Sequence, residues 1–138
     1  MYEAHKSSHY LLSLCLVMPA LRDILLFCYE KCPSLRVAHC HILRQASEHA
    51  RFAWHIDNDP GDFDSKITRY VKKTFVFNLT SSHTSMRLKG GEEFFFEEPG
   101  VGAFFDSAVD HKTEKADVNT LKLAVFMYDP NEYDAASD

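Results

Sequence analysis

The sequence has few cysteines and is poor in basic charge. Its four cysteines, Cys15, Cys28, Cys32 and Cys40, lie in the first third of the chain without the Cys-x-x-Cys spacing of a zinc ribbon or redox motif. We interpret them as reduced core thiols of a cytosolic protein. Fifteen lysines and arginines against 20 acidic residues give a net charge of −5, so nucleic acid is not favoured as a partner.

Long apolar runs are also missing. The most apolar stretch, Tyr10 to Met18, is interrupted by Ser13, ended by Pro19, and too short to cross a bilayer. The residues before it lack the positive start and the small-residue cleavage site of a signal peptide. We therefore expect no membrane segment and a cytoplasmic location.

With 138 residues, the chain is expected to form one domain, 1–138. Residues 1–34 have a helical pattern, with one helix over Tyr10 to Met18 and another from Pro19 to about Lys31. Residues 35–127 have the pattern of short strands. The acidic tail 128–138 contains almost no apolar residues, so we expect it to fray.

Turn sequences such as Gly90-Gly91 and Pro99-Gly100 separate the expected strands. These strands are Val37 to Leu43, Arg51 to Ile56, Thr74 to Leu79, Met86 to Leu88, Glu92 to Phe96, Gly102 to Phe105 and Leu121 to Met127. Many short strands after two helices predict a mainly β protein, a sandwich or jelly roll. Several phenylalanines could leave an apolar sheet face exposed, and formation of a homodimer is one way to cover it. They are Phe94, Phe95, Phe96, Phe104 and Phe105.

Two histidines and one aspartate are candidate metal ligands. His55 and Asp57 alternate along an extended segment and so project to the same side, while Trp54 faces the other side. His111 follows an apolar strand and a short turn, which places it at the rim of the core. Two histidines and one carboxylate match the facial triad of non-haem Fe(II) oxygenases, whereas a structural zinc site is usually closed by cysteines. The simpler alternatives are a turn-capping aspartate and surface histidines.

Lys122 lies inside a strand that is otherwise apolar. A buried lysine needs an anion or a route to water. It is either exposed on an edge strand, or it is a cation inside the barrel that pairs with a carboxylate of a small molecule. Its place shortly after His111 favours the second interpretation.

The order of these features resembles the Fe(II)- and 2-oxoglutarate-dependent dioxygenase superfamily, and most of all its prolyl-hydroxylase-like branch. The features are His55-x-Asp57, Gly90-Gly91-Glu92, Gly102-Ala103-Phe104-Phe105 leading to His111, and Lys122. The resemblance covers roughly Leu35 to Met127. It implies a cupin-like double-stranded β-helix, with the N-terminal helices packed on one sheet.

The resemblance implies that His55, Asp57 and His111 bind Fe(II), and that Lys122 holds the far carboxylate of the co-substrate 2-oxoglutarate. Such enzymes hydroxylate or oxidatively demethylate a substrate and release succinate and CO2. Asp57 argues against halogenation, because halogenating relatives lack this carboxylate. Two positions depart from the pattern: Gln45 and Asn78 stand where many members have tyrosines, and we expect both to contact the co-substrate.

The substrate is expected to be a small molecule or a peptide. The irregular stretch Asn58 to Lys73 is the candidate lid. Arg44, Trp54 and Arg87 are weak candidates for substrate contacts, because packing and solvated charge explain them equally well.

Other interpretations remain open. One is a catalytically silent β-helix that serves as a binding module. Another is a cupin-like isomerase or dioxygenase that binds metal through His39 and His41. A nucleic-acid-oxidising member of the superfamily and a zinc site of Cys28, Cys32 and one of these histidines are less favoured.

Overall fold

A computed structural model describes residues 19–45, 54–58 and 66–136. The predicted helix Tyr10 to Met18, residues 51–53 of the predicted strand from Arg51, and residues 59–65 of the predicted lid lie outside these ranges. Within them, no helix is long and apolar enough to cross a membrane.

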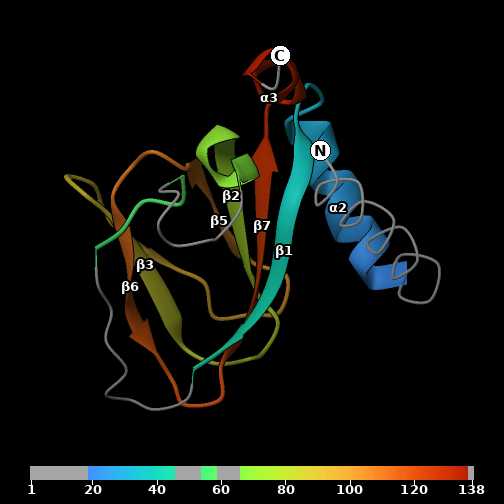
Figure 1. Ribbon diagram of the computed structural model, residues 1–138. Helices are drawn as coiled ribbons and strands as arrows, with labels where there is room; N and C mark the ends of the chain where they lie inside the picture. The colour runs from blue at the N-terminus through green and yellow to red at the C-terminus, as the bar shows by residue number, and fades with distance from the viewer. Residues whose placement is uncertain (1–18, 46–53, 59–65, 137–138) are drawn as a thin grey trace.

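Two antiparallel sheets face each other (Figure 1). The four-stranded sheet has the order β1 (Arg36–Arg44), β7 (Leu121–Tyr128), β2 (Val71–Asn78) and β5 (Gly102–Asp106). The three-stranded sheet has the order β4 (Glu93–Phe95), β3 (Thr84–Leu88) and β6 (His111–Ala116). His55 forms an isolated antiparallel bridge with His111, which extends this sheet by one short segment. Because the chain passes back and forth between the sheets, the fold is a double-stranded β-helix, as predicted.

Alternation along β7 builds two separate cores. Leu123, Val125 and Met127 face outward and pack with Leu25 and Cys28 of the helix α2 (Pro19–Lys31). The residues between them, Ala124 and Phe126, face the space between the two sheets, where Val76, Met86, Phe96 and Phe105 join them. The prediction that an N-terminal helix packs on one sheet is therefore confirmed for α2, which lies along the outer side of the four-stranded sheet (Figure 1).

Gly102 allows β5 to pair closely with β2. A Cβ atom at this position would overlap the carbonyl oxygen of Val76. Any larger residue would push the two strands apart, because the obstacle is backbone rather than a movable side chain. The pairing of β5 with β2 begins with Gly102 opposite Phe77 and ends with Asp106 opposite Lys73. The residues that follow β5 are therefore held beside the start of β2.

The six predicted strands that lie fully within the described residues agree with the structure to within three residues at each end. β6 was not predicted from the sequence. Its inward positions carry His111 and Thr113 and its outward positions Lys112 and Glu114, so no apolar alternation marks it. The strand is recognisable only through its pairing with β3.

The prediction of a frayed tail is wrong for residues 130–136, which form the helix α3 (Pro130–Ala136). Asp129 caps this helix: its Oδ1 accepts hydrogen bonds from the backbone N–H of Asn131 and, more weakly, of Glu132, at 2.9 and 3.4 Å. Tyr133 is 8% exposed and its ring meets the edges of Tyr70 and Tyr128. The buried Tyr133, the Asp129 cap and the 2.7 Å ion pair between Glu132 and Lys72 of β2 attach this short helix to the sheet.

The candidate lid Asn58 to Lys73 is also more regular than predicted. Lys66–Tyr70 forms a short 3-10 helix, η1, and β2 already begins at Val71. The phenylalanines divide between core and surface: Phe96 and Phe105 are buried, whereas Phe94, Phe95 and Phe104 are 43–58% exposed. Formation of a homodimer stays a prediction.

Candidate metal centre

His55 and His111 are joined through their backbones. Each donates its N–H to the carbonyl oxygen of the other, at 3.0 and 2.9 Å. This bridge places the two imidazole rings side by side, with centroids 4.3 Å apart. The segment 54–57 thus brings a histidine from the middle of the chain to the start of β6, which is 56 residues further along.

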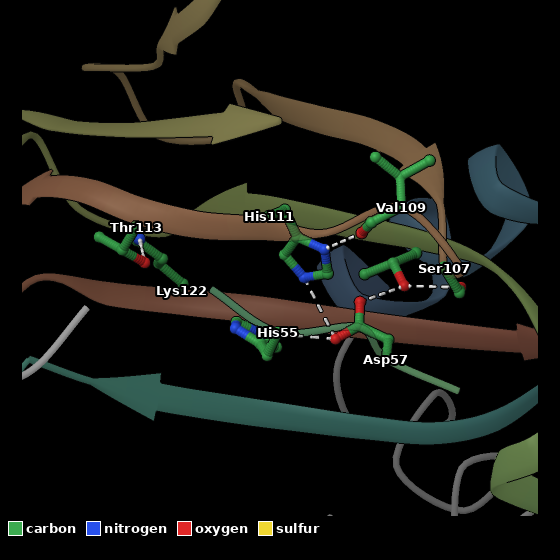
Figure 2. Close-up of polar contacts among 8 residues, drawn as sticks. His55, Asp57, Ser107, Val109, His111, Thr113 and Lys122 are labelled. Atoms are coloured by element: carbon green, nitrogen blue, oxygen red, sulfur yellow. Dashed lines mark hydrogen bonds and ion pairs between the residues drawn. The ribbon is translucent and has the colours of Figure 1, made fainter. Parts of the chain in front are cut away.

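Asp57 completes a group of three (Figure 2). Its Oδ1 lies 3.2 Å from Nε2 of His111 and 3.6 Å from Nε2 of His55. The ligand atoms of the three residues all lie within 4.8 Å of one another. In the described ranges of the chain, this is the one group of histidine, cysteine or acidic residues arranged so that it could hold a metal ion.

The geometry of this group fits a metal ion. Two ligand atoms in adjacent positions of an octahedral ion lie about 3.0 Å apart when each bond is about 2.1 Å long. The distances of 3.2 and 3.6 Å from Asp57 Oδ1 are close to this value. Nδ1 of His111 lies 2.8 Å from the carbonyl oxygen of Val109, which favours a proton on Nδ1 and leaves the lone pair of Nε2 for a metal.

The group is buried on one side and open on the other. The side chains of His111 and Asp57 are 3% and 6% exposed, whereas that of His55 is 48% exposed. Burial is the largest single influence on the pKa of His111 and lowers it. The hydrogen bond and charge of Asp57, with smaller contributions from Val109 and Asp110, together outweigh the effect of burial, so the pKa of His111 is raised overall. Entry to the group is therefore from the side of His55.

A buried pair of hydroxyl groups supports Asp57 from behind. Thr74 Oγ1 donates a hydrogen bond of 2.6 Å to Asp57 Oδ2, and Ser107 Oγ lies 2.9 Å from Thr74 Oγ1. The backbone N–H of Asp57 donates to the carbonyl oxygen of Ser107 at 2.9 Å. Neither Thr74 nor Ser107 was predicted from the sequence to belong to the site. Thr74 stands inside an apolar strand, but nothing in the sequence links it to an aspartate 17 residues earlier.

Lys122 lies inside the barrel. Lys122 is 7% exposed. Its ammonium group donates a hydrogen bond to Thr113 Oγ1 at 3.2 Å and lies 5.6 Å from the ring centre of Phe96. None of the carboxylates in the described ranges lies within ion-pairing distance of it. Burial lowers the pKa of Lys122 to about 8. A buried cation that has only one hydroxyl group and one aromatic face beside it is costly, and an anion next to it would lower that cost.

Asn78 has a different role from the one predicted. It is fully buried, and its amide group donates to the carbonyl oxygens of Ser82 and Phe96 at 3.0 and 3.1 Å. Its Oδ1 accepts from the backbone N–H and the hydroxyl group of Thr80, at 3.0 and 2.8 Å. Because two donors and two acceptor positions are the full capacity of an amide side chain, Asn78 fixes a turn and has no group left for a co-substrate.

Gln45 directly follows β1 beside the start of β7. Its backbone N–H donates to the carbonyl oxygen of Thr120 at 2.9 Å, and its own carbonyl oxygen accepts from the N–H of Asn119 at 2.8 Å. Leu43, two residues earlier, is the register partner of Lys122. Gln45 therefore stands close to Lys122 along the same two strands, and its role toward a co-substrate stays a prediction.

The weak substrate candidates do not converge on the metal group. Arg87 pairs in register with Lys112, and the neighbouring pair, Leu88 with His111, faces the interior, so Arg87 faces outward. Its guanidinium group is held by Glu93 and Glu114, both at 3.4 Å.

The ring of Trp54 is exposed and carries the ammonium group of Lys112 at 5.0 Å. Since Lys112 also faces outward, Trp54 belongs to the outer surface of this sheet. Arg44 is exposed at the end of β1.

His39 and His41 form the alternative pair on β1. Their ring centroids are 5.7 Å apart, and they pair in register with Phe126 and Ala124, which face the interior. Burial lowers the pKa of His41. No third histidine, cysteine or acidic residue among those described joins them in a group of metal-ligand geometry.

Comparison with known proteins supports the fold. No protein-family model matches the sequence. No curated protein matches it. Among solved structures, an oxidoreductase of the 2OG-Fe(II) oxygenase family from Burkholderia pseudomallei matches with a TM-score of 0.53 and 16% identity. The match covers 86% of this chain and 57% of that protein, so the chain spans little more than half of the oxygenase.

Two further structures are similar over a smaller portion of the chain. Hydroxypropylphosphonic acid epoxidase from S. wedmorenis, in complex with fosfomycin, has a TM-score of 0.41 and 16% identity over 70% of this chain and 46% of that one. A protein from Neisseria meningitidis has a TM-score of 0.43 and 11% identity over 67% and 82%. At 16% identity the match to the oxygenase from Burkholderia pseudomallei shows a shared fold and no particular reaction.

Proposed function

We propose that the protein is an Fe(II)- and 2-oxoglutarate-dependent dioxygenase. The observation that carries this proposal is the position of two groups inside one barrel: the triad of His55, Asp57 and His111, and the buried ammonium group of Lys122. A triad of two histidines and one carboxylate leaves three of six positions on Fe(II) for other ligands. The fold shared with a solved 2OG-Fe(II) oxygenase is consistent with it.

The spacing of the two groups suits a short dicarboxylate. Lys122 donates to Thr113, which follows His111 by two residues on β6 and faces the same side. Two residues along a strand correspond to about 7 Å. A five-carbon keto diacid bound to the metal at one end would extend along β6 and bring its other carboxylate to the ammonium group of Lys122.

Each residue then has a defined task. His55, Asp57 and His111 would hold Fe(II), with Val109 fixing the proton of His111 on Nδ1. Lys122 would bind the far carboxylate as a point charge. Fe(II), 2-oxoglutarate and O2 together would supply the oxidising power for the attack on a substrate C–H bond: one oxygen atom of O2 would be used to convert 2-oxoglutarate to succinate and CO2, and the other would enter the substrate. The open side at His55 is where a substrate would approach.

The substrate proposed is a small molecule or a peptide. The described outer surface of the three-stranded sheet carries acidic and basic residues in balance, with Arg87 and Lys112 both paired to Glu114. No basic face for a phosphate backbone is formed there, in line with the net charge of −5. The reaction at the substrate carbon is hydroxylation, or demethylation through a hydroxymethyl group.

Turnover without a primary substrate tests this proposal. With Fe(II), ascorbate and oxygen, the protein should convert 2-oxoglutarate slowly to succinate, and Asp57→Ala should reduce the rate to that of iron in buffer. Asp117→Ala, which changes an exposed aspartate elsewhere on the chain, is the matched control and should leave the rate unchanged. Succinate formation that is equal in the wild type and in Asp57→Ala would contradict the proposal.

A further inference from the structure

We infer that Thr74 is a positioning residue of the metal centre: its hydroxyl group, backed by that of Ser107, holds Asp57 as a ligand through Oδ1 alone. This inference rests on the proposed metal centre. It adds residues to that centre that do not touch the metal themselves. It also concerns how many coordination positions on the ion stay open.

The two carboxylate oxygens of Asp57 have different surroundings. Oδ1 is the atom that faces both Nε2 atoms, of His55 and His111. Oδ2 points away from them and accepts the 2.6 Å hydrogen bond from Thr74 Oγ1. An ionised carboxylate has only acceptor atoms, so this hydrogen bond must use the single proton of the threonine hydroxyl group. Oδ2 is therefore engaged by Thr74 and turned away from the ligand cluster.

The direction of the next hydrogen bond follows from the first. Because the proton of Thr74 is used for Asp57, the 2.9 Å contact between Thr74 and Ser107 must be donated by Ser107. The order is Ser107 to Thr74 to Asp57, and hydrogen bonds in such a chain polarise and strengthen one another. All three residues are at most 5% exposed, so water does not compete for these contacts.

Backbone contacts fix the base of this chain. Ser107 follows β5, and its N–H donates to the carbonyl oxygen of Lys72 in β2 at 3.0 Å. Its carbonyl oxygen accepts from the N–H of Asp57 at 2.9 Å. Thr74 is itself paired with Phe105 and Phe126 in the middle of the four-stranded sheet. The carboxylate is thus tied to a rigid sheet on the opposite side of the barrel from His111.

The consequence concerns the number of open positions. With Oδ2 held by Thr74, the protein occupies three positions, one for each of His55, Asp57 and His111. If the carboxylate turned so that both oxygens faced the ion, it would occupy a fourth position and leave too few for a chelating co-substrate and oxygen. Thr74 would therefore preserve the vacant positions as well as the metal affinity.

The test uses cobalt(II) as the probe and four variants. Thr74→Val removes the hydroxyl group at nearly constant shape, Thr74→Ser retains it, and Ser107→Ala removes the second hydroxyl group. Thr84→Val is the matched control, because Thr84 is also 1% exposed and donates to a backbone carbonyl oxygen, of Lys115, at 3.0 Å. We would measure the dissociation constant for cobalt(II), its visible absorption spectrum, and the melting temperature of the metal-free protein.

Thr74→Val should weaken cobalt(II) binding by about 10- to 100-fold, the usual effect of losing a partner of a metal ligand. It should also change the absorption spectrum, which reports the coordination number. Thr74→Ser should restore both properties, and Ser107→Ala should weaken binding less than Thr74→Val does. Thr84→Val should lower the melting temperature without changing binding or spectrum.

Wild-type affinity and spectrum in Thr74→Val would overturn the inference and leave the metal centre intact. An equal loss of affinity in Thr84→Val would overturn it too, since the effect would then be general destabilisation. If Thr74→Val does not fold, Ser107→Ala decides: it must weaken binding more than Thr84→Val does. A folded wild-type protein that binds no cobalt(II) would refute both the inference and the proposed function.

Discussion

Lys122→Met is expected to make the ligand-free protein more stable and, at the same time, to weaken 2-oxoglutarate binding at least about 100-fold. The ammonium group is buried and has Thr113 as its hydrogen-bond partner. Burial lowers its pKa from 10.5 to about 8, a difference that corresponds to on the order of 3 kcal/mol of destabilisation by the charge. Replacing the charge with an apolar chain of similar length should recover about 1–3 kcal/mol.

The pH dependence provides a second check of Lys122. Between about pH 8 and pH 10.5 the unfolded chain keeps the lysine proton that the folded protein has released. The free energy of unfolding of the wild type should therefore rise with pH across this window. Lys122→Met should lack this rise, and below pH 8 its stability advantage should be complete.

The loss of binding has the same physical origin. A carboxylate that enters the barrel next to methionine in place of lysine would be buried without a partner, which costs about 3–5 kcal/mol, or at least about 100-fold in affinity. Urea unfolding at pH 7 and pH 10, and equilibrium dialysis of 2-oxoglutarate with Mn(II), measure the two effects. Lys115→Met, at an exposed position of β6, is the control and should change neither. A destabilised Lys122→Met that still binds 2-oxoglutarate would show that the lysine is structural.

Asp57→Ala is expected to lower the affinity for Mn(II) or Co(II) by more than about 100-fold. Loss of a residue that merely supports a ligand costs about 10- to 100-fold, so loss of the ligand itself should cost more. The three ligand atoms lie within 4.8 Å of one another, and Asp57 Oδ1 is the atom between the two imidazoles. Without it, two histidines remain, of which His55 is half exposed.

His41→Ala is the control that separates this centre from the cupin-like alternative. His41 also lies on an inward face, with its ring 5.7 Å from that of Phe126. Calorimetric titration of both variants should show binding lost in Asp57→Ala and retained in His41→Ala. The opposite result, with binding lost only in His41→Ala, would move the metal to β1 and refute the triad.

The fold was predictable where burial leaves a pattern in the sequence. The strands around Phe75, Val125 and Phe105 are marked by apolar residues, and Pro33 marks the end of α2. β6 could not be found in this way, because its inward side chains serve the site and are polar. The helix α3 was missed for another reason. Asp129-Pro130 is a good start signal for a helix, but a single buried residue, Tyr133, gave too little periodicity to outweigh the acidic composition.

The grouping of the three candidate ligands was predictable from the sequence, but the residues around them were not. Alternation along 54–57 placed His55 and Asp57 on one side, and chain order supplied His111. Thr74 and Ser107 contact Asp57 and each other because of the way the two sheets pack together. The local sequence around Asp57 does not indicate that packing. Asn78 was predicted to contact the co-substrate and Arg87 was a weak substrate candidate. Strand register turns Arg87 outward, and the hydrogen-bonding groups of the Asn78 side chain are all used by a turn and by the backbone of Phe96.

The most direct test of the central claim is anaerobic absorption spectroscopy of the protein with Fe(II) and 2-oxoglutarate. Chelation of the keto acid by iron in the triad predicts a visible metal-to-ligand charge-transfer band. The band should be absent in His111→Ala and weakened in Lys122→Ala at the same 2-oxoglutarate concentration. A folded, iron-loaded protein without such a band would contradict the account and favour a catalytically silent binding module.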